Sequence, residues 1–156
     1  MKKTRVLIAD DSEKLISALQ VQLEVHGFDV ITCTDAYMAL AHAQKQRPDV
    51  MILDIRMPAG NGFSVLERMR KLPELRGIPV IYITGDQSSS LDFQAEQLGA
   101  CGLIHKPISF PILLQMIDSA VQRVFRQDAD SREPLEEHIF NISADPNPSE
   151  IPGVKL

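Results

Sequence analysis

Short apolar runs alternate with longer amphipathic stretches along most of the chain. The apolar runs lie at residues 5–9, 29–33, 49–53, 79–83 and 102–105. The first, third and fourth runs are almost continuous in apolar residues, as is typical of strands that are covered on both faces of a sheet. The pattern therefore predicts five strands, three of which are deeply buried.

The amphipathic stretches between these runs have the spacing of helices. They lie at residues 13–26, 36–46, 62–71, 89–98 and 110–126. In the first stretch Leu15, Leu19 and Leu23 recur four residues apart, so they form one apolar stripe along a helix. Ser12 can cap the start of this helix, and Gly27 follows its end as a left-handed residue would.

Five strands alternating with five helices predict an α/β fold. Each unit of one strand and one helix is about 20 to 30 residues long, which indicates crossover connections between parallel strands. We predict a doubly wound five-stranded parallel sheet in the strand order 2-1-3-4-5. The pattern stops near Asp128, so residues 1–127 are predicted to form one domain. Residues 128–156 are acidic and rich in proline, and we expect a flexible C-terminal tail or linker there.

The composition excludes several classes of protein. The chain has 156 residues, a net charge of −5 and two isolated cysteines, Cys33 and Cys101, which we interpret as small core residues in a reducing cytoplasm. No basic stripe offsets the negative charge, so we expect no direct binding of nucleic acid. No stretch approaches the ~18 apolar residues of a membrane span, and the first apolar run meets Asp10 too early for a signal peptide.

The first apolar run ends abruptly in two adjacent aspartates, Asp10 and Asp11. Two like charges beside a low-dielectric core are unfavourable unless a cation lies nearby. In an open parallel sheet the functional site lies at the carboxyl ends of the strands. Asp54, Thr84 and Lys106 end the third, fourth and fifth predicted strands, so all five side chains should meet at one edge of the sheet.

This set of side chains suits phosphoryl transfer. Carboxylates bind hard divalent ions, and Mg²⁺ usually takes one or two of them together with phosphate oxygens and water. With Mg²⁺ held by Asp11 and Asp54, a phosphoryl group could reach the free carboxylate oxygen of Asp54. Lys106 and Thr84 would then stabilise the phosphoryl oxygens. The sequence therefore predicts an acyl phosphate on Asp54.

Four segments occur in order, each at a predicted strand end: "ADDSE", "DIRMPAGNG", "ITG" and "HKP". Together they make residues 4–126 resemble the receiver domain of response regulators in two-component signalling, which has a flavodoxin-like (CheY-like) fold. The resemblance implies that Asp54 is the phosphoacceptor and that Asp10 and Asp11 form the acidic pocket. It also implies that the Arg56 backbone carbonyl completes the Mg²⁺ site.

The resemblance implies roles for further residues near the last strand. Thr84 and Lys106 become the switch hydroxyl and the phosphate-binding lysine, and the bond between Lys106 and Pro107 is expected to be cis. Receiver domains usually carry an aromatic residue three positions before the lysine, where this chain has Leu103. Four histidines, His26, His42, His105 and His138, lack the spacing of metal ligands. His105 is expected in a strand or on an output surface.

Arg56 and Asp86 stand two residues after Asp54 and Thr84. In receiver domains these two positions flank the path of the water that hydrolyses the acyl phosphate. We expect the opposite charges of Arg56 and Asp86 to face each other across the site and to slow the loss of phosphate. The alternative is that both are charged loop residues exposed to solvent.

The implied function is a phosphorylation-dependent response regulator rather than an enzyme with its own substrate. It would accept a phosphoryl group from a sensor histidine kinase or a histidine phosphotransfer protein. It would signal to an output partner, or to a second copy in a homodimer, through the face that the fourth helix, fifth strand and fifth helix form. One alternative is a phosphatase of the haloacid dehalogenase type, although that family spaces its two leading aspartates one residue apart. A second alternative is a receiver-like interaction module that is never phosphorylated.

Overall fold

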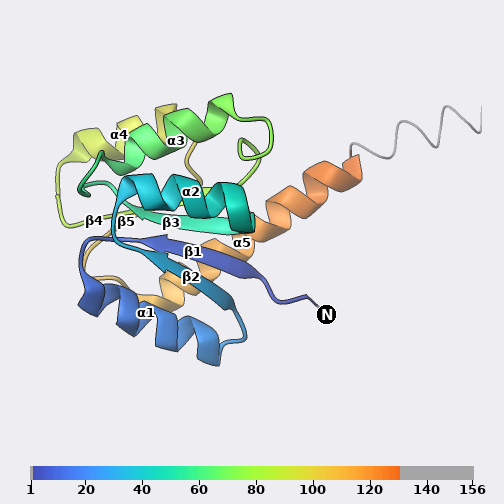
Figure 1. The fold of residues 1–156 in the computed structure, drawn as a ribbon, viewed down its shortest axis with the longest axis horizontal. Helices are drawn as coiled ribbons and strands as arrows, with labels where there is room; N and C mark the ends of the chain where they lie inside the picture. The colour runs from blue at the N-terminus through green and yellow to red at the C-terminus, as the bar shows by residue number, and fades with distance from the viewer. Residues whose placement is uncertain (1, 131–156) are drawn as a thin grey trace, which may run out of the picture. The chain divides into compact units, whose positions relative to one another are not determined.

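The computed structural model describes residues 2–130 as an α/β fold with one five-stranded parallel sheet. The strands are β1 (Arg5–Ala9), β2 (Asp29–Cys33), β3 (Val50–Asp54), β4 (Val80–Thr84) and β5 (Gly102–His105). The helices are α1 (Glu13–Val25), α2 (Ala36–Gln46), α3 (Gly62–Lys71), α4 (Ser89–Gln97) and α5 (Phe110–Asp130). The strand order is β2-β1-β3-β4-β5, which confirms the predicted fold (Figure 1).

The sheet separates two hydrophobic layers. Val6 and Ile8 of β1 pack with Leu23 of α1 and Leu113 of α5, whereas Leu7 belongs to the layer under α2, α3 and α4. This alternation follows from the two-residue period of a strand, and all of these residues have no exposed surface. Each buried side chain of this size stabilises the fold by roughly 1.5–3 kcal/mol relative to an exposed one. Figure 1 shows α1 and α2 on opposite sides of the sheet.

Three helices start with a polar side chain that caps them directly after a strand or loop. Ser12, Asp35 and Asn61 accept hydrogen bonds from backbone N–H groups three residues further on, at 3.3, 2.7 and 2.9 Å. Such caps satisfy N–H groups that have no partner inside the helix. They fix where each chain segment turns from the carboxyl end of the sheet into a helix.

Two strands begin one residue later than the apolar runs that predicted them. β3 and β4 start at Val50 and Val80, and Asp54 and Thr84 are the last residues of their strands, as predicted. In the register of the sheet, Asp54 lies opposite Ile83 and Thr84 lies opposite His105. The functional side chains are therefore mounted on hydrogen-bonded strands rather than on loops.

Residues 2–122 form one compact unit, and a second unit begins at Arg123, within α5. α5 continues to Asp130, four residues beyond the predicted end of the helix at 126. Residues 128–130 are therefore helical, and the rest of the predicted tail lies outside the described residues. Within residues 2–130, no helix is both long enough and apolar enough to cross a membrane.

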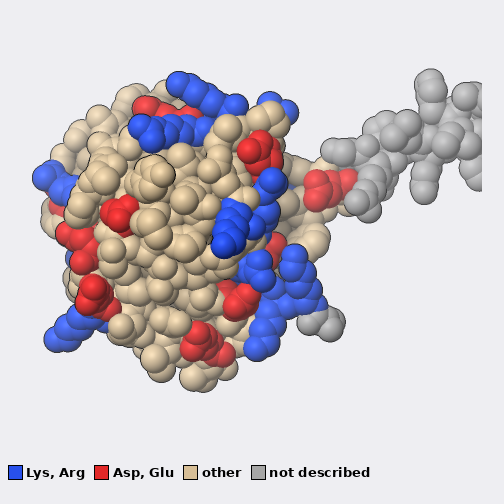
Figure 2. All heavy atoms as spheres, viewed as in Figure 1, with Lys and Arg blue, Asp and Glu red and all other residues tan. Residues whose placement is uncertain are grey.

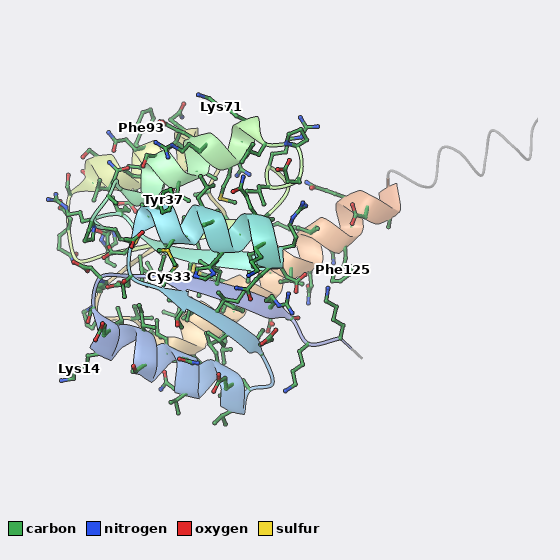
Figure 3. All side chains as sticks on the ribbon, in the orientation of Figure 1. Lys14, Cys33, Tyr37, Lys71, Phe93 and Phe125 are labelled. Carbon is green, nitrogen blue, oxygen red and sulfur yellow. The ribbon has the colours of Figure 1, made fainter. Side chains whose placement is uncertain are left out.

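Cys33 lies between the sheet and α2 (Figure 3), where burial, followed by the nearby charge of Asp35, raises the pKa of its thiol to about 12. The thiol is therefore unreactive, in keeping with a core residue. Cys101, for which we also predicted a core position, is only half-buried. In the view of Figure 2, Lys and Arg are interspersed with Asp and Glu, and no continuous basic surface covers this face.

Candidate phosphoacceptor site

Three carboxylates meet at the carboxyl end of the sheet. Asp10 directly follows β1, Asp11 comes next, and Asp54 is the last residue of β3. One oxygen from each side chain lies within 4.8 Å of the other two. Asp10 and Asp54 are buried, with exposed fractions of 0% and 4%, whereas Asp11 is exposed. The convergence predicted for these residues is therefore present.

Lys106 supplies the positive charge inside this cluster. Its Nζ lies 2.8 Å from Asp10 Oδ2 and 3.5 Å from Asp54 Oδ2. The backbone N–H of Lys106 donates to the Thr84 carbonyl at 2.7 Å, which continues the pairing of β4 with β5, and the bond to Pro107 is cis. Burial alone would lower the pKa of Lys106, but the contact with Asp10 raises it above its ordinary value. The lysine is therefore charged.

The electrostatic environment of Asp54 disfavours its negative charge. Burial, followed by the charge of Asp10, raises the pKa of Asp54 to about 6, against an ordinary value of 3.8. Lys106 and the backbone N–H of Arg56 act in the opposite direction but do not cancel these effects. A further cation beside Asp54 would consequently be favourable, and carboxylate oxygens are the kind of ligand that Mg²⁺ binds.

Thr84 has no exposed surface, and its hydroxyl contacts the loop that follows β4. Its Oγ1 accepts a hydrogen bond from the backbone N–H of Asp86 at 3.1 Å. A hydroxyl can accept one hydrogen bond and donate another, so Oγ1 retains a hydrogen to donate to an incoming oxygen. Thr84 therefore connects the carboxylate edge of the sheet with the conformation of the β4–α4 loop.

Arg56 and Asp86 form the predicted ion pair across the site. Arg56 Nη2 donates to Asp86 Oδ2, and the two residues come from the loops after β3 and β4. The backbone N–H of Ser88 and then the Arg56 guanidinium hold the pKa of Asp86 below its ordinary value. The Arg56 side chain is 74% exposed, so the pair adds little to stability. The effect of the pair on phosphate lifetime stays a prediction.

Gly62 and Tyr82 hold the start of α3 tightly against the sheet. A Cβ atom at Gly62 would lie only 2.5 Å from the backbone oxygen of Asp54. The buried Tyr82 hydroxyl donates to the Gly62 carbonyl at 3.0 Å. Only glycine allows this close approach, so Gly62 fixes the path of the loop that leaves Asp54.

Two residues of β5, Leu103 and His105, make contacts that the sequence did not predict. Leu103 is half-buried and packs against the layer of α2, α3 and α4. His105, which the sequence placed only in a strand or on an output surface, has an acceptor oxygen beside each ring nitrogen. Nδ1 lies 3.0 Å from the Asp86 carbonyl, and Nε2 lies 3.4 Å from Asp92 of α4. Its position beside Lys106 was the only signal in the sequence that could have indicated a role.

The carboxylate cluster is separate from two hollows on the surface. One, of about 500 Å³, lies between α3 and α4 and is lined by Phe63, Phe93 and Leu98 among others. The other, of about 380 Å³, lies between α1, β2 and α2. Neither is lined by Asp10, Asp11 or Asp54, and the exposure of Asp11 leaves the cluster open at the rim. Phe93 is 63% exposed on α4 (Figure 3).

The fold and the site together define a doubly wound domain with an acidic, lysine-bearing edge. The model of the response regulator receiver domain matches residues 6–118. Response regulator PleD of Caulobacter vibrioides is 33% identical over 115 residues, which are 74% of this chain and 25% of PleD. Protein PilH of Pseudomonas aeruginosa is 32% identical over 117 residues, which are 75% of this chain and 97% of PilH.

Solved structures agree with these matches. A CheY-like response regulator receiver domain protein from Methanospirillum hungatei JF-1 superposes with a TM-score of 0.75 at 26% identity, covering 81% of this chain and 99% of its own. The chain belongs to the response-regulator receiver family, a regulatory class of phosphoacceptor domains in two-component signalling. It spans nearly all of PilH but only a quarter of PleD.

Proposed function

We propose that Asp54 accepts a phosphoryl group from a sensor histidine kinase or a histidine phosphotransfer protein. The observation that carries this proposal is the meeting of three carboxylates with Lys106 at one edge of the sheet. A carboxylate oxygen of Asp54 attacks the phosphorus of a phosphohistidine, a P–O bond forms, and the P–N bond to the donor breaks. The product is an acyl phosphate on this chain.

The surrounding residues each have a separate task in this step. Lys106 lies 3.5 Å from an oxygen of Asp54, so its ammonium group can neutralise charge on the phosphoryl oxygens. The Thr84 hydroxyl retains a hydrogen for one of these oxygens. The exposed rim leaves room for a protein donor, since Asp11 is accessible from solvent.

Asp10, Asp11 and Asp54 are the residues that would hold Mg²⁺, and the Arg56 backbone carbonyl is the further ligand that the family resemblance predicts. The donor set fits this ion, because three carboxylate oxygens lie within 4.8 Å of one another. Bound Mg²⁺ supplies positive charge that offsets the repulsion among carboxylates and phosphoryl oxygens. Without it, burial and Asp10 hold the pKa of Asp54 at about 6.

We propose that α4, β5 and α5 form the surface that binds an output partner or a second copy of the chain. Ile112 of α5 is a large apolar side chain that is 52% exposed. The loop that bonds Thr84 leads directly into α4, so a change at the phosphoacceptor site can reach this surface. The predicted cytoplasmic location stays a prediction.

The experiment is phosphorylation with acetyl phosphate and Mg²⁺, followed by electrophoresis that retards phosphorylated protein. Asp54→Asn should abolish the retarded band, and hydroxylamine, which cleaves acyl phosphates, should remove it from the unsubstituted protein. Asp118→Asn is the matched control, because it removes one exposed carboxylate from α5 and should leave phosphorylation unchanged.

A retarded band in Asp54→Asn as strong as in the unsubstituted protein would refute the assignment of the phosphoacceptor. No band in the unsubstituted protein with either acetyl phosphate or a histidine kinase would instead support the receiver-like module that is never phosphorylated. The adjacent Asp10 and Asp11, together with the receiver match over residues 6–118, argue against the phosphatase alternative.

A further inference from the structure

The backbone of Asp86 connects Thr84 of β4 with His105 of β5. Its N–H donates to Thr84 Oγ1 at 3.1 Å, and its carbonyl lies 3.0 Å from Nδ1 of His105. A carbonyl oxygen can only accept, so Nδ1 carries the hydrogen in this bond. A displacement of the Asp86 backbone relative to β4 would therefore change the contact with the His105 ring.

The other side of the same ring faces α4. Nε2 of His105 lies 3.4 Å from Oδ2 of Asp92, which is in the first turn of that helix. A carboxylate oxygen also only accepts, so the ring donates to both partners in its charged form, with a hydrogen on each nitrogen. His105 stands directly opposite Thr84 in the register of β4 and β5. One ring thus touches both the loop that Thr84 holds and the helix that the loop enters.

β5 carries no phenylalanine, tyrosine or tryptophan that could make this connection. The strand reads Gly102, Leu103, Ile104 and His105, and Leu103 packs into the layer of α2, α3 and α4. Leucine has no hydrogen-bonding group that could follow the position of the Thr84 hydroxyl. Among the residues of β5, only His105 makes polar side-chain contacts with both the β4–α4 loop and α4.

We propose that His105 is a positioning residue that transmits the state of Thr84 to α4 through the backbone of Asp86. This inference rests on the proposed function of Asp54. When Thr84 donates its hydrogen to a phosphoryl oxygen, Oγ1 turns toward Asp54 and the Asp86 N–H must follow or lose its acceptor. The Asp86 carbonyl moves with the same loop, and His105 passes the displacement to Asp92.

The ion pair with Arg56 restrains the side chain of Asp86. It anchors the Asp86 carboxylate to the loop after β3, and the backbone N–H of Ser88 also donates to that carboxylate at 2.9 Å. With its side chain held at these two points, Asp86 follows the Thr84 hydroxyl by a rotation of its backbone, and its carbonyl is the group that His105 contacts.

The test is backbone amide NMR of the full chain with Mg²⁺ and beryllofluoride, an analogue of the phosphoryl group. We expect chemical shift changes at Ile55, next to Asp54, and along α4. In His105→Leu the shift changes of the α4 amides should fall below half of their original size, while Ile55 responds as before. His42→Leu, the same substitution on α2, is the matched control and should change neither response.

Two more variants separate the link from a general effect on folding. His105→Asn can still donate to the Asp86 carbonyl but is too short to reach Asp92, so it should restore the response of the Asp86 amide without that of α4. Asp92→Ala removes the acceptor from an exposed helical position and leaves β5 unchanged. It should reduce the α4 response as His105→Leu does, with no further loss in the double variant.

Full α4 responses in both Asp92→Ala and His105→Leu would overturn the link, even though Ile55 continued to respond. If His105→Leu did not fold, Asp92→Ala would decide the question alone. A protein without any response at Ile55 would overturn the proposed function of Asp54, and the link with it. The two failures are therefore distinguishable in one set of spectra.

Discussion

Replacement of Asp54 by asparagine should stabilise the protein in the absence of metal. Burial and the charge of Asp10 raise the pKa of this carboxyl from 3.8 to about 6, so the folded state favours its neutral form. At about 1.4 kcal/mol for each pKa unit, the ionised carboxylate costs up to about 3 kcal/mol of folding free energy at neutral pH. Asparagine has nearly the same shape and carries no charge.

The sign of the pH dependence follows from the same values. Because the folded-state pKa is the higher one, the protonated carboxyl contributes stability that is complete below pH 3.8 and is lost as the pH rises through about 6. The advantage of Asp54→Asn should therefore be about 1–3 kcal/mol at pH 7.5 and close to zero at pH 4.

The assay is urea unfolding with EDTA at both pH values, with equal m-values in the two proteins as the test of a shared unfolding transition. Asp118→Asn again serves as the control, because it removes a carboxylate from the exposed side of α5. An Asp54→Asn variant that is no more stable than the parent at pH 7.5 would refute the reasoning. An advantage of the same size at pH 4 would refute it as well.

Mg²⁺ should raise the melting temperature, and EDTA should block phosphorylation by acetyl phosphate. Asp11→Ala should remove the thermal effect of Mg²⁺. Phosphorylation that is insensitive to EDTA would contradict the metal role. Arg56→Ala and Asp86→Ala should each speed the loss of phosphate, and the double variant should show less than the product of the two effects. Strictly multiplicative effects would exclude the gate. Gly62→Ala should cost about 1–3 kcal/mol in urea unfolding, because its Cβ would lie 2.5 Å from the backbone oxygen that ends β3; equal stability to Gly77→Ala, whose Cβ meets nothing within 4 Å, would contradict this.

The carboxylate cluster could be predicted because its position depends only on where strands end. Continuous apolar runs mark β1 and β3, and the strand order of a doubly wound sheet places these strands side by side. Asp10 and Asp54 must then be neighbours, whichever loops follow. An error of one residue in the starts of β3 and β4 did not matter, because Asp54 and Thr84 remained at the same edge.

The length of α5 was not predictable in the same way. The apolar periodicity ends before the helix does, since Gln127 and Asp128 are polar residues that do not continue the apolar stripe. A helix continues through its hydrogen bonds until a residue such as glycine or proline interrupts it, and none occurs between Pro111 and Asp130. A prediction from hydrophobicity alone therefore ends α5 four residues too early.

The contacts of His105 lay beyond the sequence for a different reason. A side chain at the end of a strand can reach any of several loops, and the choice depends on the path of the β4–α4 loop. That path is fixed by the hydrogen bonds from Asp86 to Thr84 and from Ser88 to Asp86. Such bonds connect residues two positions apart, and no periodic pattern in the sequence predicts them.

The structure also refines why adjacent aspartates are tolerated after β1. Lys106 lies 2.8 Å from Asp10 and thus offsets the charge of the most deeply buried carboxylate of the cluster. It does not offset that of Asp54, because the pKa of this residue still rises to about 6. Asp11 lies in solvent, where its charge is screened. The charge that is left uncompensated is therefore on the proposed phosphoacceptor, and a divalent cation bound between Asp11 and Asp54 would remove this cost before the phosphoryl group arrives.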